Sequence, residues 1–199
     1  FTAAVKFEGL YGTNTLNNLS AGMISASGND AAQTWAVYGG DGVEVINNSG
    51  KILGAVALHG GNDVFNNKAG GLWDIAATTN SDFGDGNDAI NNAVGGTILV
   101  GTGKVELGAG NDSLANAGTL RIGTAGIISF GDGDDTASNA TGALLDLAGG
   151  SVLMGTGTNA FANAGTVKIT GAGNTIDAGV AGTVTNTGLF NFMNGVTTD

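Results

Sequence analysis

The residues best placed to do chemistry are acidic side chains in a glycine-rich turn that recurs along the chain. The element Gly-x-Gly-x-Asp-x-apolar is complete at 84–90 (GDGNDAI) and 108–114 (GAGNDSL), and 131–137 (GDGDDTA) has a small residue in the last place. Looser forms begin at Gly40, His59 and Gly155. The formal charge is −11, with 17 acidic and six basic residues, so cations are the natural partners. Nucleic acids and membrane insertion are not expected, because anionic partners require clustered cations and the sequence contains no long apolar run.

This turn resembles the calcium-binding nonapeptide of RTX-type secreted proteins. The resemblance implies that Ca²⁺ is held between stacked turns, with Asp63, Asp88, Asp112 and Asp135 as ligands and Asp85, Asp132 and Asp134 nearby. A divalent ion would also relieve the repulsion between stacked carboxylates about 5 Å apart. The RTX motif recurs at every nonapeptide, whereas here it recurs once in about 24 residues. The alternative is that the Asp or Asn only caps a turn whose corner faces water.

Catalytic groupings are sparse in this sequence. Polysaccharide lyases and hydrolases need a basic residue or paired carboxylates in a groove. Arg121 is the only arginine, the lysines are scattered, and His59 is the only histidine and replaces a turn glycine. We therefore expect no catalytic residues and no enzyme activity, with a polysaccharide-cleaving enzyme as the third-ranked function.

A column of asparagines marks the repeat that must position these turns. The second Asn of each motif is separated from the next by 30 residues at first and by 19 to 25 afterwards. Such a column predicts a structural ladder in which each amide bonds to the one above and to the turn backbone. Its members are Asn18, Asn48, Asn67, Asn92, Asn116, Asn139, Asn163 and Asn186.

Apolar residues alternate with polar ones before and after each Asn, which is typical of strands with one buried face. The inward pairs after the Asn include Ile98/Val100 and Leu145/Leu147, and a third strand carries pairs such as Val105/Leu107. The pattern predicts an all-β, right-handed parallel β-helix (β-solenoid) of about eight coils of roughly 24 residues, with three short strands per coil. Thirty-eight glycines suit the corners, and the absence of proline suits interior strands.

We expect a single solenoid domain over residues 1–199. It divides into an irregular first coil (1–39), regular coils (40–188) and a terminal strand (189–199). In the first coil, Trp35 and Tyr38 follow an insertion; either they form a binding loop, or Trp35 and Val37 belong to a strand, as their alternation favours.

The stretches NAGTLRI (116–122), NAGTVKI (163–169) and NTGLFNF (186–192) resemble the β-helical passenger region of autotransporter-type surface proteins. The resemblance implies an extracellular or cell-surface rod, as a passenger segment or a free filament subunit. We therefore expect a structural or adhesive protein that stacks end to end on copies of itself or on further coils of the same chain. The alternative is a Ca²⁺-stabilised module that binds a glycan, a host protein or another cell-surface ligand.

Overall fold

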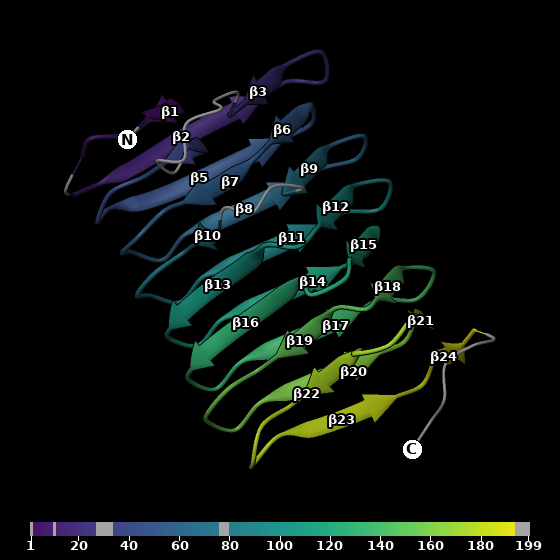
Figure 1. Cartoon of the computed structure of the whole chain (residues 1–199). Coiled ribbons are helices and arrows are strands. Elements are labelled where there is room, and N and C mark those ends of the chain that lie inside the picture. The colour runs from purple at the N-terminus through teal and green to yellow at the C-terminus, as the bar shows by residue number, and fades with distance from the viewer. Residues whose placement is uncertain (1, 10, 27–33, 76–79, 194–199) are drawn as a thin grey trace.

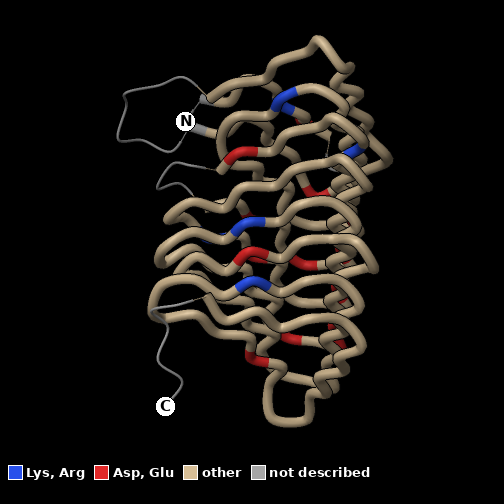
Figure 2. Tube along the Cα trace, turned by 90° about the vertical axis from the view of Figure 1, so that its right-hand side faces the viewer, with Lys and Arg blue, Asp and Glu red and all other residues tan. Residues whose placement is uncertain are grey.

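The structure, a computed structural model, describes residues 2–9, 11–26, 34–75 and 80–193. Its strands wind into a stack of coils in which each coil gives one strand to each of three parallel sheets (Figure 1). No helix occurs among the described residues. Figure 2 views the same stack from the side and shows its charged residues scattered thinly over the coils.

Each sheet contains eight strands, all parallel to their neighbours. Sheet A consists of β1 (Thr2–Lys6), β4 (Thr34–Tyr38), β7 (Ala55–Ala57), β10 (Ser81–Asp82), β13 (Lys104–Ala109), β16 (Ile127–Asp132), β19 (Ser151–Leu153) and β22 (Thr175–Asp177). Sheet B consists of β2 (Thr13–Asn18), β5 (Val43–Asn48), β8 (Val64–Asn67), β11 (Ala89–Asn92), β14 (Ser113–Asn116), β17 (Thr136–Asn139), β20 (Ala160–Asn163) and β23 (Thr183–Asn186). Sheet C consists of β3 (Met23–Ser25), β6 (Lys51–Leu53), β9 (Leu72–Ile75), β12 (Thr97–Val100), β15 (Thr119–Ile122), β18 (Leu144–Ala148), β21 (Thr166–Thr170) and β24 (Leu189–Phe192).

This architecture confirms the predicted all-β parallel solenoid with three strands per coil and about 24 residues per turn. The winding amounts to about seven turns, slightly fewer than the eight coils predicted, although every sheet has eight strands. The strand β1 was not predicted. It pairs with β4 through Ala3, Val5 and Lys6, which face Trp35, Val37 and Tyr38.

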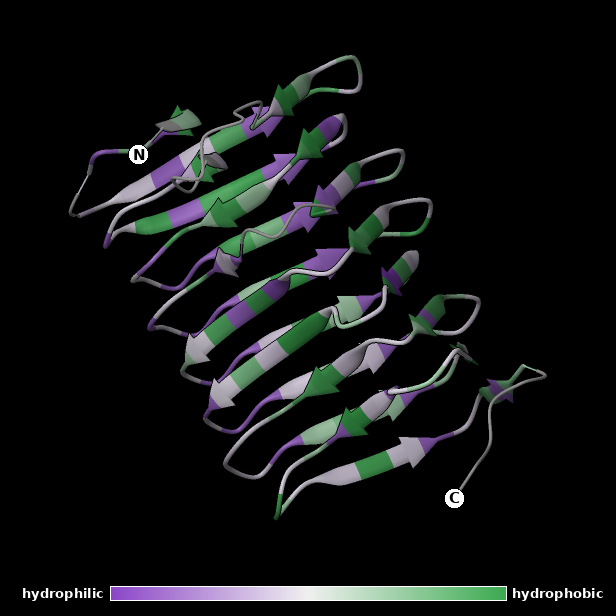
Figure 3. Ribbon diagram, viewed as in Figure 1, coloured by the Kyte–Doolittle hydropathy of each residue, from purple (hydrophilic) through white to green (hydrophobic). Residues whose placement is uncertain are grey.

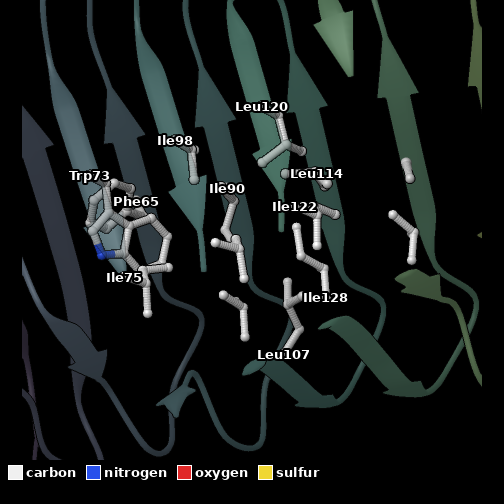
Figure 4. Packing of buried hydrophobic residues seen from close by; sticks show 14 of the residues in the cluster. Phe65, Trp73, Ile75, Ile90, Ile98, Leu107, Leu114, Leu120, Ile122 and Ile128 are labelled. Carbon is white, nitrogen blue, oxygen red and sulfur yellow. The ribbon is translucent and has the colours of Figure 1, made fainter. Parts of the chain in front are cut away.

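The core is a set of apolar columns that run along the axis of the stack. In sheet B, Ile46, Phe65, Ile90 and Leu114 lie above one another in register, each at most 5% exposed. Figure 3 shows the alternation of apolar and polar residues along the strands, and Figure 4 shows the inward side chains stacking from coil to coil. Because each coil alone covers little of its own apolar surface, the stack is stable only as a whole.

Glycine is required where a turn comes close to the coil before it. Gly86 has a φ of 146°, and a Cβ placed there would lie 1.5 Å from the carbonyl oxygen of Gly61. Gly110 repeats this relationship one coil later, at 1.8 Å from the oxygen of Gly86. The backbone at this corner therefore packs so tightly that no side chain fits.

The strand interpretation of the first insertion is confirmed for the described part of it. Residues Thr34–Tyr38 form β4, which pairs with β1 on one side and with β7 on the other. The ring of Trp35 lies 5.3 Å from that of Tyr38, in a tilted arrangement. Residues 27–33 of the predicted loop lie outside the described residues.

Candidate functional site

The four aspartates of the Gly-x-Gly-x-Asp turns form a buried column directly before the strands of sheet B. Asp63, Asp88, Asp112 and Asp135 are each at most 1% exposed. Each lies two residues before an inward apolar side chain, as Asp88 lies before Ile90, so the alternation of the strand directs the carboxyl into the stack. The structure thus brings these four predicted residues together along one line, inside the corner.

Each of these carboxyls uses one oxygen to join two coils. The backbone N–H of Asp63 donates to Asp88 Oδ1 at 2.7 Å, and the N–H of Asp88 donates to Asp112 Oδ1 at 2.8 Å. The same bond links Glu44 N–H to Asp63 and Asp112 N–H to Asp135. The hydrogen bonds satisfy backbone donors that the corner would otherwise bury without a partner.

The other oxygen of each carboxyl is buried and unpartnered. Oδ2 of all four aspartates is buried and receives no hydrogen bond from the described residues. A buried polar atom without a partner is costly and calls for an explanation, such as a bound proton or ion. In each of these coils, the aspartate therefore has one oxygen, Oδ1, that joins two coils and one oxygen, Oδ2, that is available to a proton or an ion.

Burial raises the pKa of these carboxyls, because the charged form loses its hydration. The pKa rises from an ordinary value near 3.8 to about 7 for Asp63, about 8 for Asp88 and about 6 for Asp112. The hydrogen bond from the backbone N–H opposes this rise in each case, and neighbouring carboxyls add to it. Burial raises the pKa of Asp135 and Glu44 in the same direction.

Asn159 continues the column with an amide in place of the acid. Its Oδ1 accepts the backbone N–H of Asp135 at 2.8 Å, as the aspartates do for their neighbours. Its Nδ2 donates to the carbonyl oxygens of Met154, Gly155 and Thr156 at 3.1, 3.4 and 3.3 Å. Three backbone oxygens thus converge on the second side-chain atom of Asn159.

This geometry fits a hard cation in part. The carboxylate Oδ2 and convergent carbonyls are the oxygen ligands that Ca²⁺ takes, but Ca²⁺ needs six to eight of them. Among the described residues, no group of three or more His, Cys, Asp or Glu side chains is arranged to hold a metal ion. The assignment of Ca²⁺ to Asp63, Asp88, Asp112 and Asp135 therefore stays a prediction.

The acids named as neighbours of the site lie on the outside of the same corner. Asp85, Asp132 and Asp134 are exposed, and Asp134 Oδ1 accepts the backbone N–H of Thr158 at 2.7 Å. Asp132 Oδ1 accepts the hydroxyl of Thr156 at 2.8 Å. An outer ladder, which sequence reasoning missed, continues from Asp134 through asparagine side chains, in the order Asn111, Asn87 and Asn62.

The asparagine column forms a second buried ladder at the opposite end of the sheet B strands. Seven bonds from Nδ2 to the Oδ1 of the next coil, of 2.7–2.9 Å, run without a break from Asn18 to Asn186. All seven of these amides donate a further bond to the backbone, as Asn92 does to Thr119 O at 3.0 Å. Both ends of sheet B are thus fixed by side chains that bond along the axis.

His59 takes the place of a turn glycine with a left-handed backbone. Its φ is 72°, and its ring lies 4.7 Å from the ring of Tyr38 in an edge-on contact. Its Nε2 is buried and has no hydrogen-bond partner among the described residues. A cavity of about 350 Å³ lies beside it, lined also by Lys6 and Asp41.

Sheet C carries a short column of alternating charge on its outer side. Asp146 Oδ2 lies 3.4 Å from Arg121 Nη1 and 3.5 Å from Lys168 Nζ, although the Asp146 side chain is only 7% exposed. In Figure 2, red and blue segments alternate over neighbouring coils of this side. These three residues therefore stabilise one another across the stack and are a structural feature.

No helix among the described residues is long and apolar enough to cross a membrane. The chain was also compared with family models, curated proteins and solved structures. No family model matches it, and neither a curated protein nor a solved structure does so.

Proposed function

We propose that the chain is a non-enzymatic structural rod of an extracellular or cell-surface protein, with an adhesive outer face. One observation carries the proposal: the asparagine ladder, which is buried from Asn18 to Asn163, runs on to Asn186 in the last coil without interruption. Interior polar residues are thus committed to holding coils together. Such side-chain ladders are typical of stacked β-structures that owe their rigidity to repetition.

The outer face of sheet B is the surface best suited to adhesion. Its outward positions carry only Thr, Asn, Val, Ala and Ser over all eight described strands, as in Thr15, Asn47, Ala115 and Thr185. Side chains stacked at the regular spacing between strands, about 4.8 Å, present a repeating uncharged surface. A repeating ligand such as a glycan would match such a surface at many points.

The proposed location is tested on intact cells of the source organism. Antibodies against the purified chain should label intact cells, and external protease should remove the signal. Labelling that appears only after lysis would refute the surface location. Incubation of the purified chain with a panel of polysaccharides tests the non-enzymatic assignment, and release of oligosaccharides would contradict it.

The adhesive face is tested with charge substitutions. Beads coated with the chain should bind to a glycan array, and Ala115→Glu combined with Ala162→Glu on sheet B should weaken that binding at least several-fold. Thr97→Glu combined with Thr166→Glu adds the same charge to sheet C and is the matched control. Equal losses from both pairs would place adhesion elsewhere than on sheet B.

A second candidate role is stabilisation by Ca²⁺, and the spare Oδ2 atoms favour it. Asn159 shows three carbonyl oxygens within reach of the equivalent atom, so an ion there would meet both carboxylate and carbonyl ligands. Ca²⁺ should then raise the melting temperature of the chain, whereas Mg²⁺, which demands a tighter octahedron, should do so less. No thermal shift with either ion would leave the column with a structural role alone.

A further inference from the structure

The two ends of the stack expose the apolar columns that are covered everywhere else. Val184 and Phe192, in the last coil, are 54% and 52% exposed, whereas Phe161 and Ile169, which pair with them one coil earlier, are 2% and 8% exposed. The first coil leaves Leu16 and Ile24 only partly buried. Figure 1 shows that these two coils lie at opposite ends of the stack.

The two ends offer matching strands in the same order. The first coil presents β1, β2 and β3 as the outer strands of sheets A, B and C, and the last coil presents β22, β23 and β24. All strands are parallel, so a copy shifted along the axis would place β1 beside β22, β2 beside β23 and β3 beside β24. The contact would repeat the coil-to-coil pairing found inside the chain.

The asparagine ladder has a direction that makes the ends complementary. Every Nδ2 donates toward the last coil, so Asn18 Oδ1 accepts no hydrogen bond from the described residues at the first coil. At the other end, Asn186 Nδ2 turns back to the carbonyl oxygen of Gly188 at 3.3 Å, because no further amide follows it. One end therefore offers an acceptor and the other a donor, at the same position of the strand.

Side-chain size also matches across the ends. Two of the inward columns, continued by one step, would place Phe192 over Ala26 and Ala178 over Phe7. In these two columns a large side chain meets a small one, whereas Phe190 would lie over Ile24. Large residues facing small ones fill a stack without voids or clashes.

The two ends of the stack also carry complementary charges. Asp177, on the outer side of β22, occupies the same column as Lys6 on β1, through the register of sheet A. A shifted copy would place this acid directly beside that base. Opposite charges on adjacent strands stabilise the pairing, and like charges would oppose it.

We infer that a second copy of this chain stacks head to tail, its first coil on the last coil of the first copy, and that Asn186 Nδ2 then donates to Asn18 Oδ1 of the second copy. Such a contact is heterologous and does not close, so it extends into a filament one solenoid wide. The inference deepens the proposed rod function but is independent of where the protein resides. Failure of the surface labelling described above would therefore leave it intact.

Cysteine cross-linking tests the register, because the chain has no cysteine of its own. Asn17 and Thr185 are exposed, lie at opposite ends of sheet B, and become neighbours only across a head-to-tail junction. The variant Asn17→Cys/Thr185→Cys, treated with diamide, should form a ladder of disulfide-linked multimers. The control Ala115→Cys/Thr185→Cys should not, because Ala115 lies in the middle of the stack. Equal cross-linking of both variants would overturn the register.

A charge exchange with sedimentation velocity tests the contact itself. The unmodified chain should sediment as concentration-dependent multimers, Asp177→Lys should weaken this association at least several-fold, and adding Lys6→Asp should restore it. A monomer at every concentration of the unmodified chain would overturn the proposal and assign the open ends to further coils or to another partner. Loss of association in Asp177→Lys without recovery in the double variant would refute the pairing of Asp177 with Lys6.

Discussion

Asn159 occupies, in its own coil, the place that Asp135 occupies in the coil before it, and its Oδ1 accepts the backbone N–H of Asp135 at 2.8 Å. The column therefore accepts either an acid or an amide, and only the amide carries its own donor for the nearby carbonyls. The two side chains have the same shape, so they differ mainly in whether the second atom needs a proton or an ion.

We expect Asp88→Asn to stabilise the chain at pH 8 in the presence of a chelator. The amide keeps the bond from Asp63 N–H, and its Nδ2 would donate to carbonyl oxygens as that of Asn159 does. Removing a buried unpartnered oxygen should be worth about 1–3 kcal/mol in the free energy of unfolding. Urea unfolding measures it, and Asp85→Asn on the exposed side of the corner is the control, with little expected change. A destabilised Asp88→Asn variant would contradict this account.

Stability should fall as the pH rises, in contrast to common acid denaturation. Carboxyls with a higher pKa in the folded chain than in the unfolded chain bind more protons when folded, between those two values. For Asp63, Asp88 and Asp112 the ordinary value is near 3.8 and the folded values are about 7, 8 and 6. Their contribution is therefore complete below about pH 4 and is lost as the pH rises through about 6 to 8.

Thermal melts in a chelating buffer from pH 4 to pH 9 measure this dependence. Each pKa unit corresponds to about 1.4 kcal/mol, so the loss should be several kcal/mol for each of the three carboxyls. The Asp88→Asn variant should show a shallower slope because it lacks one of the titrating groups. A melting temperature that rises over the same range would show that the carboxyls are ionised in the folded chain at low pH.

If Ca²⁺ binds at the column, it should compete with protons there. Adding Ca²⁺ at pH 7 should raise the melting temperature and release protons, which a pH electrode detects in weakly buffered solution. Asp112→Ala should abolish most of the thermal shift, because Asp112 lies between Asp88 and Asp135 in the column. Asp134→Ala, outside the corner, is the matched control. Equal shifts in both variants would exclude the buried column as the site.

The inward and the outward asparagine of one strand should differ sharply in their contribution to stability. Asn92 is 1% exposed and donates to Asn116 Oδ1 and Thr119 O, whereas Asn91, on the outer side, donates to Asn66 Oδ1 and has no other side-chain bond to the described residues. We expect Asn92→Ala to lower the free energy of unfolding by about 1–3 kcal/mol or more and Asn91→Ala to lower it by about 0.5 kcal/mol. Equal losses in chemical unfolding would mean that the inner ladder has no special role.

The register of sheet C is tested by placing a charge in the core. Leu145 is 3% exposed, so Leu145→Asp buries an unpaired carboxylate and should unfold the chain, at a cost of more than about 4 kcal/mol. Lys68→Ala, on an exposed corner, should be nearly silent in circular dichroism melts. Lys168→Ala is a poor control because Lys168 lies beside the buried Asp146. A folded Leu145→Asp variant would refute the inward position.

The fold could be predicted from the sequence because its main signal is repeated in every coil. Pairs such as Leu120/Ile122 and Val152/Met154 alternate with polar residues, and the structure buries them at 0–1% exposure. The sequence pattern does not predict β1, because this strand precedes the first asparagine motif. It does not predict β10 either, because Ser81 is at the inward position, where other coils have Val or Ile.

The sequence predicts the position of the acid column but not its burial. The repeat predicts that the four aspartates lie at one corner of the stack, and the two alternatives drawn from it are a Ca²⁺ site and a turn cap that faces water, not a position inside the stack. A signal was present, since Asp88, Ile90 and Asn92 alternate with period two, so an inward Ile90 implies an inward Asp88. The pKa values could not be foreseen, because they depend on how much water the neighbouring coils exclude.

The axial direction of the asparagine ladder has a consequence for mechanical loading. When the two ends are pulled apart along the axis, the force acts on one interface between coils at a time, because consecutive coils are joined by a single covalent strand. Each coil that detaches breaks its backbone bonds and one Asn–Asn bond together, then releases about 24 residues. Extended chain spans about 3.4 Å per residue, so each step should lengthen the molecule by on the order of 80 Å. Under tension the rod would therefore lengthen in steps of similar size, and its coils would unfold one after another and dissipate the applied load.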